Sequence, residues 1–201
     1  MPSMINEKQK IVYLHLSKTG GSWSRGILEQ HDFKIIDIKS FGGHLPNSPK
    51  YKDYFTFGFV RHPVSWYKSL YRFFKTNDWV LNPDGGFSGA VFTDLKSDNI
   101  NDFLDTIRRK DKFDLNEMYN RFFVEHPVSY IGKYENLYED LHLCLKLNGI
   151  NATNLIRDRA THYVNKSNAY DCNLSPENLE YIYDSCDDIF KTFNYKKDET
   201  E

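Results

Sequence analysis

Short hydrophobic runs along the chain predict the strands of a sheet. Residues 11–16 are apolar at almost every position and begin with β-branched side chains, which is typical of a strand buried on both faces of a parallel sheet. Residues 54–60 are a run of aromatic and β-branched side chains, and the segments 33–38 and 128–134 also have the character of strands. We therefore expect four strands, which in chain order cover residues 11–16, 33–38, 54–60 and 128–134.

Segments with a helical spacing of apolar residues separate these runs. The expected helices cover residues 64–74, 100–109, 135–147 and 175–193, with a further helix that begins near residue 22. Asp98 or Asn99 is the expected cap of the helix at residue 100, and Ser175 with Pro176 begins the last helix. Residues 76–98 show little periodicity and predict a long loop.

The alternation of strands and helices predicts an α/β fold, with a central parallel sheet and helices on both of its faces. The chain has 201 residues, enough to bury a substantial core, and no linker, low-complexity tract or repeat divides it. We expect a single domain over residues 1–201, with flexible ends at residues 1–9 and 196–201. Ligands of such sheets bind beyond the carboxyl ends of the strands.

Composition excludes several kinds of partner. The chain has 26 Lys and Arg against 28 Asp and Glu, a net charge of −2, and no basic block, which argues against nucleic acid and anionic membranes. No apolar run reaches about 18 residues, and the N-terminus is polar, so we expect neither a membrane span nor a signal peptide. The three cysteines and the histidines lack metal-site spacing. We therefore expect a cytoplasmic protein that binds no metal.

A glycine-rich loop follows the first expected strand. The segment Lys18-Thr-Gly-Gly-Ser22 leads into a helix, and its two glycines allow a tight turn and the close approach of a ligand. Ser22 is expected to cap this helix, whose first N–H groups and positive dipole end favour an anion, and Lys18 adds a positive charge. In the Walker A motif, by contrast, the Lys follows the glycines. The loop predicts a phosphate site.

A second candidate phosphate ligand follows the strand at residues 54–60. Arg61 ends that strand, Pro63 can occupy the first turn of the next helix, and Ser69 lies about two helical turns further on. Arginine suits bidentate contact with a phosphate, and serine can add a supporting hydrogen bond. The alternative is an Arg61 that only pairs with a surface carboxylate.

Four motifs, in this order along the chain, resemble sulfotransferases that use 3′-phosphoadenosine 5′-phosphosulfate (PAPS), a family with a P-loop-like fold. Residues 18–23 resemble the 5′-phosphosulfate loop of that family, and residues 60–71 resemble its 3′-phosphate motif. Between them, Gly43-His-Leu-Pro46 resembles the segment that carries the catalytic base in the cytosolic branch. Residues 126–137 resemble a later strand that ends in Tyr-Glu-Asp-Leu.

The resemblance implies roles for individual residues. His44 would be the general base, and Lys18 would stabilise the charge that builds up during transfer. The implied cofactor contacts are Lys18, Thr19, Gly20, Gly21, Ser22, Trp23, Arg61, Ser69, Tyr134, Lys166 and Ser167. Trp23 and Tyr134 match residues near the adenine of the cofactor in the cytosolic branch. The chain departs from that branch at Asn136, which replaces Asp, and in lacking the Arg-Lys-Gly clamp near the C-terminus. Lys166 and Ser167 instead lie in a segment similar to the carbohydrate-type branch.

Several of these residues also have a purely structural interpretation. Trp23 can be a core residue on a helix face, which is the usual role of tryptophan. His15 fits a packing role at the end of its strand, and His44 can be a loop histidine without chemistry. The acidic residues Glu135, Glu139 and Asp140 are most simply a solvated helix face.

The expected activity is the transfer of a sulfuryl group from PAPS to a hydroxyl, or less readily an amine, of a small-molecule or carbohydrate acceptor, without a metal. Two other classes stay open. A P-loop kinase-like phosphotransferase would share the strand, loop and helix but needs Mg²⁺ ligands. A non-catalytic PAPS- or phosphate-binding protein would need the anion site and no base.

Overall fold

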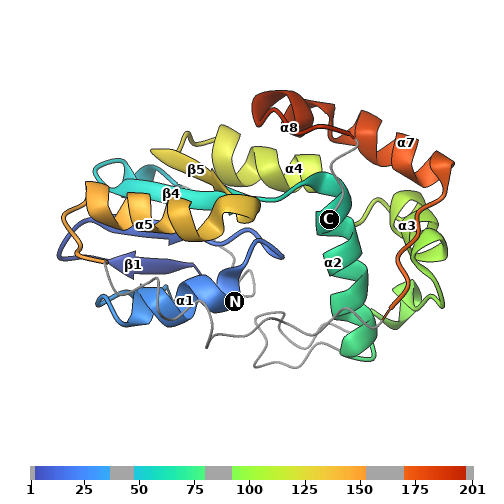
Figure 1. Ribbon diagram of the computed structural model, residues 1–201, viewed down its shortest axis with the longest axis horizontal. Coiled ribbons are helices and arrows are strands. Elements are labelled where there is room, and N and C mark those ends of the chain that lie inside the picture. Colours follow the sequence, from blue (N-terminus) through green and yellow to red (C-terminus); the bar gives the residue numbers. More distant parts are fainter. Residues whose placement is uncertain (1–2, 37–47, 80–91, 153–169, 198–201) are drawn as a thin grey trace. The chain divides into compact units, whose positions relative to one another are not determined.

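The computed structural model describes residues 3–36, 48–79, 92–152 and 170–197, and the chain divides into two compact units (Figure 1). The first comprises Met1–Arg61 and Asn120–Val164, and we call it the sheet unit. The second comprises His62–Tyr119 and Asn165–Glu201, and we call it the helical unit. The expectation that both belong to a single domain stays a prediction.

The sheet unit is built on a mixed, five-stranded sheet with the order β3-β1-β2-β4-β5 among the described residues. The strands are β1 (Met4–Asn6), β2 (Ile11–Leu14), β3 (Lys34–Ile35), β4 (Phe55–Val60) and β5 (Tyr130–Lys133). β4 is parallel to β2 and to β5, whereas β1 is antiparallel to β2 and to β3. The α/β class is confirmed, and the sheet is mixed rather than parallel throughout.

Strand β1 lies within residues 1–9, the segment that the sequence predicts to be a flexible end. Residues 7–10 are too few for a crossover connection, so β1 and β2 form an antiparallel hairpin. Met4 is fully buried, and the amide nitrogen of Asn6 donates to Gln9 Oε1 (2.8 Å) and to the carbonyl of His31 (3.0 Å). These contacts attach the start of the chain to the sheet. At the other end, residues 198–201 lie outside the described part of the chain.

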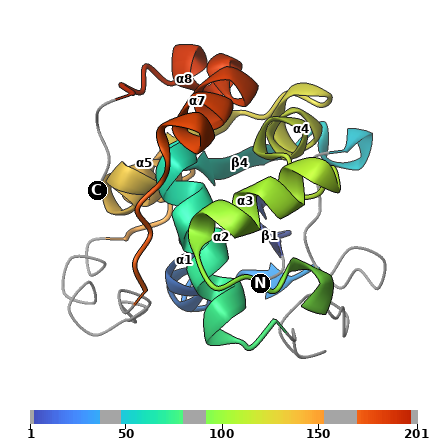
Figure 2. The ribbon, with the colours of Figure 1, turned by 90° about the vertical axis from the view of Figure 1, so that its right-hand side faces the viewer.

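Helices α1 (Gly21–Glu29) and α5 (Leu137–Leu147) cover one face of the sheet (Figure 2). Alternate side chains of β2 and β4 point to this face. One hydrophobic cluster joins the strands and both helices, and it contains Met4, Ile11, Tyr13, Ile27, Leu28, Phe33, Phe57, Phe59, Leu141, Cys144, Leu145, Ile150 and Ala152. On the opposite face, the π-helical turn Asn120–Val124 places Phe123 against Gly58, where a Cβ would lie 2.5 Å from the ring. Two short 3₁₀ helices, η1 (Pro49–Tyr51) and η5 (Tyr134–Asn136), complete the unit's described helical elements.

The helical unit packs three helices against one another. α2 (Pro63–Thr76), α3 (Ile100–Arg109) and α7 (Pro176–Ser185) are in mutual contact, and α4 (Leu115–Tyr119) contacts α8 (Asp187–Thr192). A 3₁₀ helix, η3 (Thr93–Leu95), precedes α3. The bounds predicted for α3 are confirmed. The helix predicted over residues 175–193 is instead two helices, because the backbone leaves helical geometry at Cys186 (φ −112°, ψ 18°).

Aromatic side chains form the core of the helical unit. Trp66, Tyr71 and Phe74 of α2 are almost completely buried, as is Phe103 of α3. The Phe74 ring stacks on Trp79 with a centroid distance of 5.8 Å and an interplanar angle of 4°. Each such ring removes a large apolar surface from water, so this cluster is a main source of the unit's stability.

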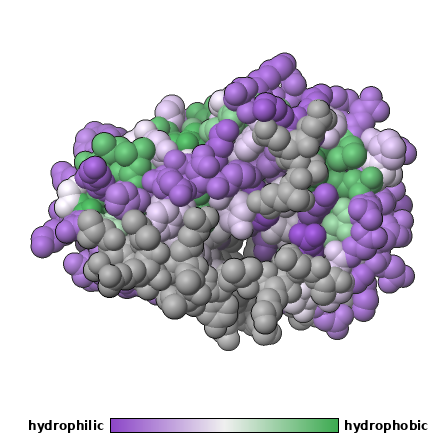
Figure 3. Space-filling model, in the orientation of Figure 1, coloured by the Kyte–Doolittle hydropathy of each residue, from purple (hydrophilic) through white to green (hydrophobic). Residues whose placement is uncertain are grey.

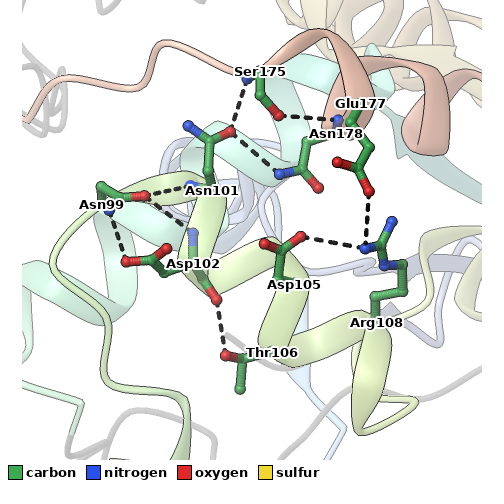
Figure 4. A network of polar contacts seen from close by, with 9 residues as sticks. All are labelled: Asn99, Asn101, Asp102, Asp105, Thr106, Arg108, Ser175, Glu177 and Asn178. Carbon is green, nitrogen blue, oxygen red and sulfur yellow. Dashed lines mark hydrogen bonds and ion pairs between the residues drawn. The ribbon is translucent and has the colours of Figure 1, made fainter.

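Polar side chains link α3 to α7 at the surface (Figure 4). Asn101 Oδ1 accepts from the backbone N–H of Ser175 (2.8 Å) and from Asn178 Nδ2 (3.3 Å), and Asn101 Nδ2 donates to the carbonyl of Asn173 (3.0 Å). Arg108 approaches Asp105 and Glu177 at 3.5 Å each. Most polar groups of this network meet a partner of complementary character, whereas the buried Asn178 Oδ1 has no hydrogen-bond partner within the described residues.

The caps predicted for the two helices are confirmed. Asn99 Oδ1 accepts from the backbone N–H groups of Asn101 and Asp102 at the start of α3. Ser175 Oγ accepts from the N–H of Asn178 at the start of α7, and Pro176 occupies the first turn. These side chains satisfy N–H groups that have no acceptor within the helix.

The face shown in Figure 3 is mainly hydrophilic over the described residues, with separate hydrophobic patches. Large hydrophobic side chains that remain exposed among the described residues include Leu143 and Leu147 of α5, together with Ile35 and Val124. No helix in the described part of the chain combines the length and the apolar character that a membrane crossing requires.

Candidate anion site

The candidate site lies at the carboxyl ends of β2, β4 and β5 in the sheet unit. Leu14 of β2 pairs with Gly58 of β4, and Val60 of β4 pairs with Lys133 of β5. Because these strands are parallel and in register, the residues that follow them emerge at one edge of the sheet. Lys18, Arg61 and Tyr134 follow β2, β4 and β5, and the structure brings these three predicted residues together.

The loop after β2 turns sharply before α1. Lys18 and Gly20 have left-handed backbone conformations, with φ of 66° and 83°. Buried Thr19 turns its hydroxyl inward and donates to the carbonyl of Leu16 (2.7 Å), so only its backbone can face a ligand. The left-handed conformation is unfavourable for a residue other than glycine, such as Lys18, and backbone strain of this kind is common at functional sites.

The start of α1 corrects the prediction that Ser22 caps the helix. Gly20 is the N-cap, and no side chain accepts a hydrogen bond from the first N–H groups of the helix as a cap. Ser22 is an exposed residue of the first turn. The left-handed Gly20 lets the chain enter the helix two residues earlier than the sequence suggests. The first N–H groups of a helix have no acceptor within it, so the amides of Gly21 and Ser22 are donors that an anion can use.

The two glycines are also required by packing. A Cβ on Gly20 would lie 2.3 Å from Leu137 Cδ2 and 3.2 Å from the Tyr134 ring. A Cβ on Gly21 would lie 2.0 Å from His15 Nε2. The glycines therefore let the loop sit against the start of α5 and against His15. The buried His15 has the packing role at the end of its strand that the sequence favours.

Two positive charges lie close together at this edge. The carbon at the centre of the Arg61 guanidinium is 4.1 Å from the centroid of the Tyr134 ring. Burial, and to a smaller extent the positive charge of Arg61, together lower the pKa of Lys18 to about 7. Both effects disfavour the charged amine. A bound anion would reverse the second effect, because it would attract both cations.

The end of β5 is held by a carboxylate that the sequence interpretation places on a solvated helix face. Asp140 of α5 accepts from Tyr130 Oη at Oδ1 (2.8 Å) and from the backbone N–H of Lys133 at Oδ2 (2.7 Å). This contact depends on how α5 packs against β5, so no local sequence signal reveals it. The glycine at position 132 of β5 is the one hint of this close packing, since a Cβ added there would lie 2.9 Å from Asp140 Cβ.

The other predicted residues are placed as follows. Trp23 is half-buried and packs against Tyr138, with ring centroids 6.1 Å apart, and its predicted contact with the cofactor stays a prediction. Ser69 lies half-buried in α2 of the helical unit, and its pairing with Arg61 of the sheet unit stays a prediction. His44, Lys166 and Ser167 lie outside the described residues.

Comparison with models of protein families, with curated proteins and with solved structures found no match. The functional argument therefore rests on the site itself. The donor set at the strand ends, two cations and the first amides of α1, fits an anionic group such as a phosphate or a sulfate ester.

Proposed function

We propose that this protein is a PAPS-dependent sulfotransferase, which transfers a sulfuryl group to a hydroxyl, or less readily an amine, of a small-molecule or carbohydrate acceptor. The observation that carries the proposal is the juxtaposition of Lys18 and Arg61 beside the first amides of α1. Burial and the charge of Arg61 both disfavour the protonated form of Lys18. A phosphate or sulfate bound at this edge would favour the protonated amine and accept hydrogen bonds from both side chains.

The sequence motifs make the anion more specific. An anion site at this edge of an α/β sheet suits many phosphorylated ligands. The resemblance of residues 18–23 and 60–71 to the two phosphate motifs of sulfotransferases favours a nucleotide with phosphates at its 5′ and 3′ positions. Arg61 lies at the strand end where that resemblance requires a 3′-phosphate ligand.

Each residue would then have a defined task. PAPS would supply an activated sulfuryl group with adenosine 3′,5′-bisphosphate as the leaving group. Protonated Lys18 and the amides of Gly21 and Ser22 would hold the negative charge that grows on the reacting oxygens. His44 would accept the proton of the acceptor hydroxyl, in keeping with an imidazole that titrates near neutral pH. Positioning and electrostatics would supply the catalysis, as in phosphoryl transfer.

The test is sulfate transfer from ³⁵S-labelled PAPS to a panel of acceptors, with and without a chelator, beside a parallel assay with γ-³²P-labelled ATP. The proposal expects labelled sulfate in an acceptor regardless of chelator, and no labelled phosphate. Chelator-sensitive phosphate transfer would support a P-loop kinase instead. Binding of adenosine 3′,5′-bisphosphate without any transfer would support a non-catalytic binding protein.

The role of His44 is tested separately. His44→Ala should lower turnover by roughly 10²–10⁴ and leave the affinity for adenosine 3′,5′-bisphosphate nearly unchanged, because other residues hold the phosphates. His31→Ala is the matched control, since it removes a histidine outside the predicted site. A His44→Ala variant with parental turnover would reject His44 as the base.

A further inference from the structure

The position of the Arg61 guanidinium depends on Tyr134. An arginine side chain has many rotamers, and a cation placed over an aromatic face loses some of that freedom in exchange for electrostatic attraction. The guanidinium carbon lies 4.1 Å from the Tyr134 centroid, which is well within the range of this interaction. The ring therefore holds the guanidinium at the edge of the sheet where Lys18 also lies.

The position of Tyr134 depends in turn on the end of β5. Tyr134 begins the 3₁₀ turn η5 directly after Lys133, the last residue of the strand. The Asp140 carboxylate accepts from the N–H of Lys133 and from the hydroxyl of Tyr130, the first residue of the same strand. One carboxylate thus fixes both ends of a four-residue strand.

The surroundings of Asp140 favour this arrangement. Burial, and then the hydrogen bond to the Asp140 carboxylate, raise the pKa of Tyr130, so its hydroxyl stays protonated and donates. A side chain on Gly132 would collide with Phe59 Cε1 at 2.7 Å and with Asp140 Cβ at 2.9 Å. Glycine at this position lets α5 approach β5 closely enough for the carboxylate to reach Lys133.

We infer that Asp140 is a positioning residue for anion binding: it fixes the end of β5, and through Tyr134 it holds the Arg61 guanidinium in place. This inference rests on the proposed function in so far as the anion is a nucleotide phosphate. Tyr134 then acts on Arg61, which is a different role from the contact with adenine that the family resemblance implies.

The experiment compares Asp140→Asn with Glu139→Gln, which removes a neighbouring exposed carboxylate of the same helix. An asparagine side chain is almost the same size but is uncharged and has one acceptor oxygen instead of two, so it cannot accept from both Tyr130 Oη and the Lys133 N–H as the carboxylate does. The first readout is the rate at which phenylglyoxal modifies Arg61 in the ligand-free protein, followed by peptide mass spectrometry. The second is calorimetric affinity for adenosine 3′,5′-bisphosphate.

We expect Asp140→Asn to accelerate modification of Arg61 and to weaken binding by about three- to tenfold, while Glu139→Gln changes neither. Tyr134→Leu should reproduce the faster modification, and Tyr134→Phe should not, because it keeps the ring. Tyr130→Phe removes one of the two donors to Asp140, so it should accelerate the modification of Arg61 and weaken binding to a smaller extent. This variant replaces Asp140→Asn in the experiment if Asp140→Asn fails to fold.

Parental reactivity of Arg61 in Tyr134→Leu, and in Asp140→Asn or its substitute Tyr130→Phe, would overturn the inference. A parent protein that does not bind adenosine 3′,5′-bisphosphate would overturn the proposed function alone. The reactivity of Arg61 is measured without any nucleotide, so it still decides whether Asp140 and Tyr134 hold the guanidinium.

Discussion

The polar residues of the two units are arranged in opposite ways. In the helical unit, Asn101 exchanges hydrogen bonds with the start of α7, and Arg108 lies between two carboxylates. In the sheet unit, Lys18 lies beside a second cation, Arg61, in a setting that lowers the pKa of the amine to about 7. Complementary pairs stabilise a fold, whereas a desolvated pair of like charges destabilises it.

This difference separates structural from functional polar residues. In the α3–α7 network, hydrogen bonds between the two helices account for most of the polar side chains, with Asn178 Oδ1 as the exception. Lys18 itself has φ of 66°, and it lies near the Arg61 charge and before a helix start that no side chain caps, so a bound anion would stabilise this edge. Strain and shifted pKa values of this kind concentrate at functional sites. We therefore propose that the sheet edge binds an anion and that the α3–α7 network stabilises the helical unit.

The largest expected effect follows removal of the Lys18 charge. Lys18→Met should lower sulfate transfer by about 10²–10³, because one preorganised charge contact is lost. The same variant should melt at a higher temperature than the parent at pH 7, since a desolvated amine is replaced by an apolar side chain of similar length. Lys8→Met, at an exposed lysine of the β1–β2 turn, is the control and should change neither property. A variant that is both less stable and fully active would contradict the comparison.

The pH dependence of stability sharpens the same point. Lys18 has a folded pKa of about 7 and an unfolded pKa near 10.4, so between these values the unfolded state binds more protons. The free energy of unfolding contributed by this residue is therefore lowest at and below pH 7 and rises as the pH increases toward 10. Urea unfolding of the parent and of Lys18→Met at about pH 6.5, 8 and 9.5 isolates this contribution. Parallel curves for the two proteins would show that Lys18 titrates normally.

An effect of intermediate size, on the free energy of unfolding, is expected from a substitution in the helical unit. Asn101→Ala removes three hydrogen bonds and should lower the free energy of unfolding by about 1–3 kcal/mol. The affinity of the folded protein for adenosine 3′,5′-bisphosphate should not change, because none of the predicted nucleotide contacts belongs to this network. Urea unfolding and calorimetric titration measure the two quantities. Loss of affinity with unchanged stability would place a ligand site in this network.

The smallest effect is expected at the edge of the same network. Arg108 and its partners Asp105 and Glu177 are all exposed, and the two contacts are long, at 3.5 Å. Arg108→Ala should lower the free energy of unfolding by less than about 1 kcal/mol, and added salt should reduce the difference. A larger loss that salt does not reduce would mean that Arg108 contributes through packing instead.

Sequence alone predicts the elements whose signals are local. β2, β4 and β5 are apolar runs, and Asn99 and Ser175 mark helix starts through their own side chains. The strand β1 is missed because three residues, of which Asn6 is polar, give no readable pattern. The break between α7 and α8 is missed because nothing in the sequence around Cys186 interrupts the helical spacing.

The candidate site, too, is predictable from the sequence only where the signals are local. Lys18 and Arg61 each follow a predicted strand and Tyr134 is the last residue of one, so the rule that parallel strands present their carboxyl ends together brings them to one edge. The role of Asp140 is invisible in the sequence, because it depends on the packing of α5 against β5. The N-cap at Gly20 is missed because its left-handed conformation, rather than a side chain, begins α1.

The most direct measurement of the central claim is a calorimetric titration of the parent protein with adenosine 3′,5′-bisphosphate and with AMP at about pH 8, in two buffers of different ionisation enthalpy. Charged hydrogen bonds to a phosphate contribute roughly 1.5–3 kcal/mol each, so the bisphosphate should bind at least about tenfold more tightly. Its binding should also take up a proton, because an anion beside Lys18 raises the pKa of an amine that is largely neutral at this pH. Equal affinities for the two nucleotides, or binding without proton uptake, would contradict the account.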